Sequence, residues 1–152
     1  MDTVRSILGS KGSSVISVSP ESTLDQALKV MSEHNVGAVV VLDAEGRLMG
    51  IFSERDFARK FGMEGRSLAA TKVKELMTSE VLTIIPDTSI PDCMRLMSEK
   101  RIRHLPVLAN GKLMGVISIG DVVKALIKAQ EETITEQARQ IGQLNNYITG
   151  SP

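Results

Sequence analysis

The chain contains one unit written twice, and this internal repeat constrains its fold more than any other feature. Residues 15–42, VISVSPESTLDQALKVMSEHNVGAVVVL, align without a gap on residues 81–108, VLTIIPDTSIPDCMRLMSEKRIRHLPVL. One residue then drops out, after which GIFSERD at 50–56 aligns on GVISIGD at 115–121. A duplication on this scale predicts two equivalent supersecondary units that pack against each other.

Both copies predict the same order of elements: a short strand, a helix, a hairpin of two strands, and a second helix. In the first copy we expect these elements at 15–18, from Thr23 onward, at 38–42, 48–52 and 56–61. In the second copy we expect them at 81–84, from Ser89 onward, at 105–108, 113–117 and from 121 to about 129. A similar lead-in precedes each copy, VRSIL at 4–8 and VKELM at 73–77.

Local signals support these assignments. Thr23 with Gln26 three residues later forms a capping-box pattern, which marks the start of a helix. Gly46 and Gly111 lie in short polar segments between apolar runs, where a hairpin turn needs a residue that tolerates positive φ. The apolar residues that follow Thr23 recur with a helical period and predict one buried helix face.

A single β-α-β-β-α unit would expose an apolar sheet face, so we expect two copies to cover each other about a pseudo-twofold axis. The sequence thus predicts an α+β fold with repeats at 3–62 and 71–129, a linker at 63–70 and a C-terminal amphipathic helix and tail at 130–152. The tail carries a narrow apolar seam suited to a partner helix. Its residues are Ile134, Ala138, Ile141, Leu144 and Ile148.

Composition excludes several classes of function. Lysine plus arginine equals aspartate plus glutamate at 18 each, so there is no net field to attract nucleic acid or an anionic membrane. Aromatic residues make up 3% of the chain, which disfavours a stacking surface for single strands. Cys93 is the only cysteine, which excludes an intrachain disulfide and a thiolate zinc site. We expect a cytoplasmic protein that binds neither nucleic acid nor membranes and holds no metal.

The repeated Ser-x-x-Asp has two readings. Ser53 with Asp56, and Ser118 with Asp121, could each cap a helix and place a favourable charge in its first turn. Both pairs, however, stand where an apolar strand meets a helix, three residues after a glycine. A carboxylate there can accept two hydrogen bonds from a vicinal diol such as the 2′ and 3′ hydroxyls of a ribose. This chemistry predicts a nucleoside held by its sugar.

A phosphate on such a nucleoside would need cations placed away from the carboxylates. Arg55 lies inside the first motif, and RIRHLP places Arg103 and His104 at the start of a strand. Arginine can donate two parallel hydrogen bonds to phosphate oxygens. The positions that correspond to these three residues are Gly120, Gly37 and Ala38, so the two clefts should differ in charge.

The duplicated unit, RHLPV at 103–107 and the two copies of Gly-x-x-Ser-x-x-Asp resemble the CBS-domain pair, also called the Bateman module, over residues 3–129. The resemblance implies two clefts between the repeats that bind adenosine-containing ligands. AMP, ADP or ATP are the first expectation, with NAD or S-adenosylmethionine also found in the family. It further implies a disc-like homodimer that senses a ligand and regulates a partner protein, without a catalytic cofactor.

Carried over by position, the resemblance implies that Asp56 and Asp121 hold ribose, assisted by Ser53 and Ser118. It implies phosphate contacts for Arg55, Arg103 and His104, with Gly37 and Gly120 at the corresponding positions of the other copy. The implied adenine walls are Ile16, Val36, Ala38 and Val116 in the Asp121 cleft, and Leu82, Ile102, Pro106 and Ile51 in the Asp56 cleft.

Two alternatives remain open from the residues. A hydrolase would need Ser, Asp and His in relay, yet the Ser-Asp pairs share one helix turn and no Gly-x-Ser-x-Gly elbow occurs. We therefore predict no catalytic residues. A structural or interaction protein with unoccupied clefts is the other alternative, and the intact Ser-Asp pair in each copy disfavours it.

Overall fold

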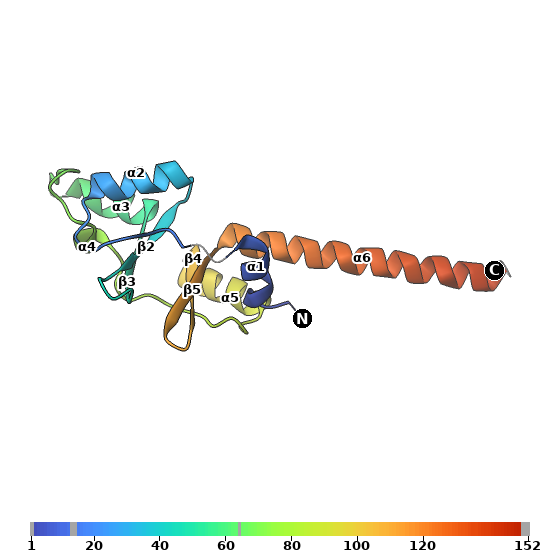
Figure 1. The fold of residues 1–152 in the computed structure, drawn as a ribbon. Coiled ribbons are helices and arrows are strands. Elements are labelled where there is room, and N and C mark those ends of the chain that lie inside the picture. Colours follow the sequence, from blue (N-terminus) through green and yellow to red (C-terminus); the bar gives the residue numbers. More distant parts are fainter. Residues whose placement is uncertain (1, 13–14, 64, 150–152) are drawn as a thin grey trace.

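The computed structural model describes residues 2–12, 15–63 and 65–149. The first half contains α1 (Val4–Lys11), β1 (Ser17–Val18), α2 (Leu24–His34), β2 (Ala38–Leu42), β3 (Leu48–Ser53), α3 (Glu54–Lys60) and the 3-10 turn η1 (Phe61–Met63). The second half contains α4 (Val73–Leu76), α5 (Ile90–Lys100), β4 (His104–Ala109), β5 (Lys112–Ser118) and α6 (Ile119–Thr149). Figure 1 shows the two halves side by side, with α6 extending away from them.

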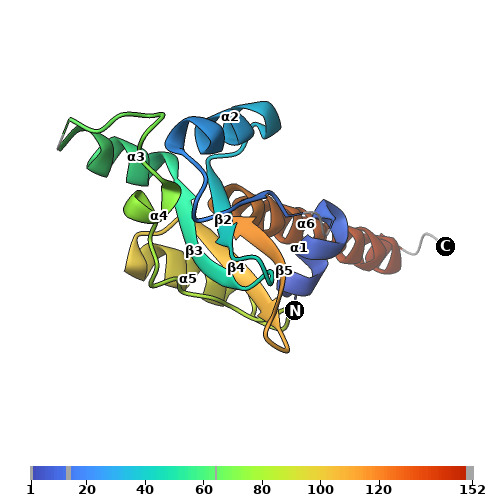
Figure 2. The ribbon, with the colours of Figure 1, turned by 60° about the vertical axis from the view of Figure 1, so that its left-hand side comes forward.

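The α+β fold class is confirmed. β1, β2 and β3 form one sheet, in which β1 is parallel and β3 antiparallel to β2, and β4 pairs with β5 in a second antiparallel hairpin. Equivalent residues face each other in the two hairpins, because Ala38 lies opposite Ser53 and His104 lies opposite Ser118. Figure 2 shows the hairpins between the helices of the two halves.

Helix and turn signals in the sequence are confirmed in the structure. Thr23 and Gln26 form a complete capping box at the start of α2, and Ser89 caps α5 by accepting a hydrogen bond from the Asp92 amide. Gly46 and Gly111 have φ values of 81° and 76°, as their hairpin turns require.

The predicted strand at 81–84 is wrong: only Ile84 forms a bridge there, with Val107. The reason lies on the partner strand. In the first copy the Val40 amide donates to the Ile16 carbonyl, whereas Pro106 occupies the position corresponding to Val40 and has no amide hydrogen to give. One proline thus removes a ladder bond and shortens the second sheet to two strands.

Each lead-in helix packs on the opposite repeat, which the sequence did not predict. Val4 and Ile7 of α1 are buried in the core of the second half, beside residues such as Leu105. Val73 and Leu76 of α4 are buried in the core of the first half. The repeats therefore exchange their lead-ins, and the continuous sequence ranges 3–62 and 71–129 do not coincide with the two hydrophobic cores.

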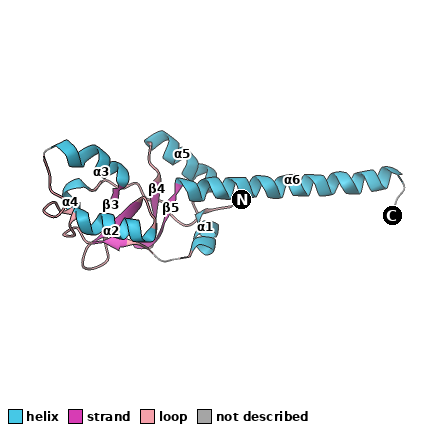
Figure 3. Ribbon diagram, turned by 90° about the horizontal axis from the view of Figure 1, so that it is seen from above, coloured by secondary structure: helices cyan, strands magenta, loops and turns pink. Residues whose placement is uncertain are grey.

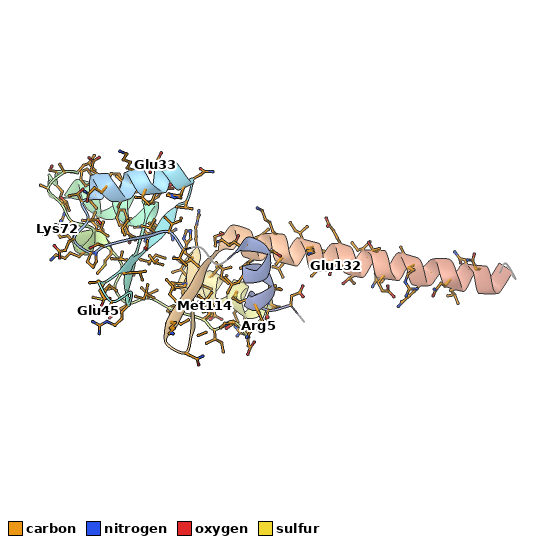
Figure 4. All side chains as sticks on the ribbon, in the orientation of Figure 1. Arg5, Glu33, Glu45, Lys72, Met114 and Glu132 are labelled. Carbon is orange, nitrogen blue, oxygen red and sulfur yellow. The ribbon has the colours of Figure 1, made fainter. Side chains whose placement is uncertain are left out.

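α6 is one continuous helix of 31 residues, with no break at the predicted boundary between 129 and 130. Val122 is fully buried in the second core, but residues 130–146 are exposed. Figure 3 shows this part of the helix beyond the body, and Figure 4 shows its side chains, with Glu132 labelled. Within the described residues, Ile127, Ile134, Ile141 and Leu144 are 51–60% exposed, and the side chain of Ile148 lies outside the described part.

Candidate functional site

A cavity of about 240 Å³ lies between the two halves. It is lined by β2 and β3 from the first hairpin, β4 and β5 from the second, the end of α1 and the segment before β1. The structure brings together here all four residues expected around adenine in the Asp121 cleft, Ile16, Val36, Ala38 and Val116. Gly37, His104 and Ser118 also line it. The cavity thus draws on both repeats.

Asp121, in the first turn of α6, does not line this cavity itself; it lines the neighbouring groove between α1 and α6 and binds Ser118 and Lys11, which do line the cavity. Its Oδ2 accepts hydrogen bonds from the Ser118 amide at 2.8 Å and from Nζ of Lys11 at 2.7 Å. Burial alone would raise the pKa of Asp121, but the hydrogen bonds from Lys11 and Ser118 outweigh it and hold the pKa below its usual value. Asp121 is therefore an anion at neutral pH, as an acceptor of sugar hydroxyls must be. The part of the chain that the structure describes supplies no hydrogen-bond partner for its Oδ1.

Lys11 is a site residue that the sequence analysis missed. Its Nζ donates to Asp121 and also to the carbonyl of Val116 at 2.8 Å, and its side chain lines the cavity. The sequence pattern could not identify Lys11, because Lys11 belongs to the first copy and lies far in sequence from the second Ser-x-x-Asp motif. Only the exchanged position of α1 brings it to the second motif.

Asp56 has a different environment, in which both carboxylate oxygens are occupied. Oδ2 accepts hydrogen bonds from the amide and hydroxyl of Ser53, each at 3.0 Å. Oδ1 accepts from the Thr78 hydroxyl at 2.9 Å and lies 3.3 Å from Nζ of Lys60. Asp56 is buried, whereas part of Asp121 is open to solvent. Here the capping interpretation describes the observed contacts.

The predicted phosphate contacts do not form a single cluster. Arg55 directs Nη1 to the Arg101 carbonyl at 2.9 Å, which ties α3 to the end of α5. The carbonyl of Arg103 accepts a hydrogen bond from the Ile119 amide, and its side chain has no hydrogen bond or ion pair within the described residues. His104 lines the cavity, so of these three residues it alone is brought to it.

Burial lowers the pKa of His104, and the charges of Lys11 and Arg103 lower it further, against the opposite effects of Asp121 and Glu54. His104 is therefore a neutral imidazole at pH 7, able to donate one hydrogen bond and accept another. Glu54 was not a predicted site residue, but a Cβ added at Gly37 would lie 3.9 Å from its Oε2 and 4.0 Å from Cε1 of His104. A carboxylate thus stands beside the cation positions.

The remaining predicted residues are dispersed. Ile51 was expected in the Asp56 cleft, but it lines the cavity on the Asp121 side. Pro106 is buried in β4, Ile102 packs against the second core and Leu82 is exposed on the surface. Gly120 follows Ser118 at the start of α6, where a Cβ would lie 3.6 Å from the Ser118 hydroxyl.

No cluster of metal-ligating side chains occurs among the described residues. The same part of the chain has no helix long and apolar enough to cross a membrane.

Comparison with known proteins identifies the repeat. The family model described as CBS domain matches twice, at residues 4–62 and 73–128. The mitochondrial CBS domain-containing protein CBSX3 of Arabidopsis thaliana is 38% identical over 156 residues, which cover 97% of this chain and 72% of that protein.

Solved structures share the same fold. A putative signal-transduction protein with CBS domains from Burkholderia ambifaria is 44% identical, with a TM-score of 0.81 over 85% of this chain and 96% of that one. The CBS domain pair of protein MJ0100, solved with 5′-methylthioadenosine and S-adenosyl-L-methionine, is 22% identical, with a TM-score of 0.75. It covers 85% of this chain and 98% of its own, and at that identity it shows the fold alone.

Proposed function

The chain belongs to the CBS domain family as a tandem pair, and from this premise we propose that it is a sensor of adenosine-containing ligands that regulates a separate partner protein. AMP, ADP and ATP are the first candidates, with NAD and S-adenosylmethionine as further ones. The observation that carries the proposal is the cavity between the halves, which has an apolar wall and is also lined by Ser118 and Lys11, the two residues that bind the ionised carboxylate of Asp121.

The contacts support the Asp121 cleft as the principal site. The walls contributed by Ile16, Val36 and Val116 are apolar, as the faces of a purine require. Within the described residues Oδ1 of Asp121 accepts no hydrogen bond, so it can take one from a ligand, and Ser118 adds a hydroxyl beside it. In contrast, Asp56 has its acceptors filled by Ser53, Thr78 and Lys60, so a ligand there must displace protein groups.

Titration calorimetry with AMP, ADP, ATP and NAD tests this proposal. We expect Asp121→Ala to weaken binding by about tenfold to a hundredfold, because two hydrogen bonds to a charged acceptor are lost. Asp92→Ala is a matched control, since Ser89-x-x-Asp92 is a third copy of the pattern that caps α5 away from the cavity. Mass spectrometry of nucleotide released from denatured protein identifies the natural ligand. Absence of heat and of thermal stabilisation with every adenine ligand contradicts the proposal.

The alternative, an interaction protein with unoccupied clefts, predicts that no adenine ligand binds while assembly stays normal.

We propose that the chain forms a homodimer in either case. Isoleucines recur every seven residues at 127, 134 and 141 on an exposed helix, a spacing that pairs helices as a coiled coil. The flanking charges Glu132, Glu136 and Arg139 lie off this seam, which leaves a second copy free of like-charge repulsion.

Light scattering of the full chain tests the helix pairing. We expect Ile134→Asp combined with Ile141→Asp to lower the dimer fraction, because two buried carboxylates would oppose association. Thr135→Asp combined with Gln143→Asp adds the same charge on the outer face and should leave assembly unchanged. Equal dimer fractions in both variants would show that the seam is not the contact.

We propose further that the chain has no catalytic activity of its own and acts in the cytoplasm. In the described part of the chain no hydrogen bond joins His104 to either Ser-Asp pair, and Cys93 is a free buried thiol, as a reducing compartment allows. Unchanged nucleotide after long incubation supports the first statement, and cell fractionation tests the second.

A further inference from the structure

The nucleoside site of the proposed function is already occupied by a side chain of the same protein. Nζ of Lys11 lies 2.7 Å from Oδ2 of Asp121 and 2.8 Å from the carbonyl of Val116. Asp121 is the proposed acceptor of ribose hydroxyls and Val116 the proposed adenine wall. The ammonium group therefore stands where the sugar would meet the base.

A diol cannot use both oxygens of Asp121 while Lys11 remains. Oδ2 already accepts from the Ser118 amide and from Lys11, which fills the two lone pairs of that oxygen. A ribose that engages both carboxylate oxygens must release Nζ from Oδ2. Withdrawal of the side chain also enlarges a cavity of about 240 Å³, which lies below the usual range of about 300–1,000 Å³ for ligand pockets.

The released charge needs a new partner. Lys11 and Arg103 both lower the pKa of His104 as positive charges, so two cations act on this lining residue of the cavity. A neutral nucleoside would leave the ammonium group without a counter-ion, whereas a ligand with a phosphate supplies one. The lysine stem is long and flexible, so its head can change partners while α1 stays packed.

We propose that Lys11 makes the Asp121 cleft selective for phosphorylated adenosines, by occupying the ribose acceptor until a ligand phosphate replaces it as the partner of Nζ. This inference rests on the proposed function. Adenosine must break the Lys11–Asp121 ion pair and forms no new one. AMP breaks the same ion pair, but its phosphate forms a new ion pair with Lys11. The ratio of the two affinities is thus the property that Lys11 sets.

Calorimetry with AMP and adenosine, on wild type, Lys11→Met and Lys11→Arg, tests the inference. In Lys11→Met we expect adenosine to bind about fivefold more tightly and AMP about tenfold more weakly, since the competing ion pair and the phosphate contact are both lost. Lys11→Arg keeps the charge and should retain the preference for AMP. Thermal unfolding of each variant verifies that α1 remains packed.

Lys128→Met is the matched control, because Lys128 lines the same groove between α1 and α6 as Lys11 yet does not bind Asp121. It should leave the affinity ratio unchanged. A ratio that Lys11→Met also leaves unchanged, or equal weakening of both ligands, overturns the inference alone. If neither ligand binds wild type or variant, the proposed function fails, and the inference fails with it.

Discussion

The two Ser-x-x-Asp motifs have the same sequence pattern and the same place at a helix start, yet their carboxylates have different partners. Asp56 is enclosed by Ser53, Thr78 and Lys60, while Asp121 meets Ser118 and a lysine from the far end of α1. The contrast originates in the exchanged lead-ins, because Thr78 and Lys11 both reach the opposite repeat. The two copies share the motif, and the lead-ins give one carboxylate a threonine partner and the other a lysine partner.

The glycines that open the motifs give the largest expected difference in stability. A Cβ at position 50 would lie 2.7 Å from the Thr78 carbonyl and 2.8 Å from Sδ of Met77. At position 115 it would meet the side chain of Leu8, with Cδ2 at 2.7 Å and Cγ at 4.0 Å. A side-chain terminus can rotate away and a backbone carbonyl cannot. We expect Gly50→Ala to lower the free energy of unfolding by about 3 kcal/mol and Gly115→Ala by about 1 kcal/mol. Urea denaturation measures both, and equal losses would contradict this asymmetry.

The carboxylates themselves should differ in the same direction. Asp56→Ala removes one member of the buried capping box of α3, the carboxylate acceptor of the Thr78 hydroxyl and the ion pair of Lys60, whose Nζ keeps its bond to the Leu76 carbonyl. The loss should lower the free energy of unfolding by about 2–3 kcal/mol. Asp121→Ala should cost about 1 kcal/mol, since its site is partly solvated, but should affect ligand binding far more. Denaturation and calorimetry on the two variants separate these effects. A more destabilising Asp121→Ala would mean that both acids are primarily structural.

The packing of each lead-in helix on the opposite repeat predicts which half of the protein is destabilised by a substitution in that helix. Val4 and Val73 are both fully buried, so substitution of either by alanine should lower stability by about 2 kcal/mol. Hydrogen exchange should accelerate in 84–126 for Val4→Ala and in 15–61 for Val73→Ala, the half opposite in sequence each time. If amide hydrogen exchange accelerated only in the repeat that follows the substituted helix in sequence, the packing of each lead-in helix on the opposite repeat would be contradicted.

The smallest expected effect concerns pH. Burial, with the charges of Lys11 and Arg103, lowers the pKa of His104 below the usual histidine value of 6.5. The unfolded chain therefore binds more protons than the folded one as pH falls through about 6.5, so stability present above that pH is progressively lost below it. His104→Gln should flatten this dependence in thermal melts between pH 7 and 5. A variant whose slope equals that of the wild type would contradict the assignment to His104.

The sequence was sufficient to predict the repeat, the fold class, the hairpins and the helix caps, because each depends on local patterns. Three outcomes depended on space instead. The segment at 81–84 forms no strand because Pro106 has no amide hydrogen to donate to it. Lys11 became a candidate site residue because the packing of α1 brings it to Asp121. Ile51 lines the Asp121-side cavity because both hairpins contribute to it. None of these follows from the spacing of residues within one copy.

Asp121 belongs to the first turn of α6, so the proposed ligand acceptor sits at the foot of a lever. At a rise of 1.5 Å per residue, 31 residues give a lever of about 46 Å. A tilt of about 5° at its foot would sweep the far end through an arc of about 4 Å, more than a side chain's hydrogen-bond reach. A small adjustment at the proposed sugar-binding carboxylate would thereby produce a larger displacement at the exposed end of α6, where a partner molecule could respond to it.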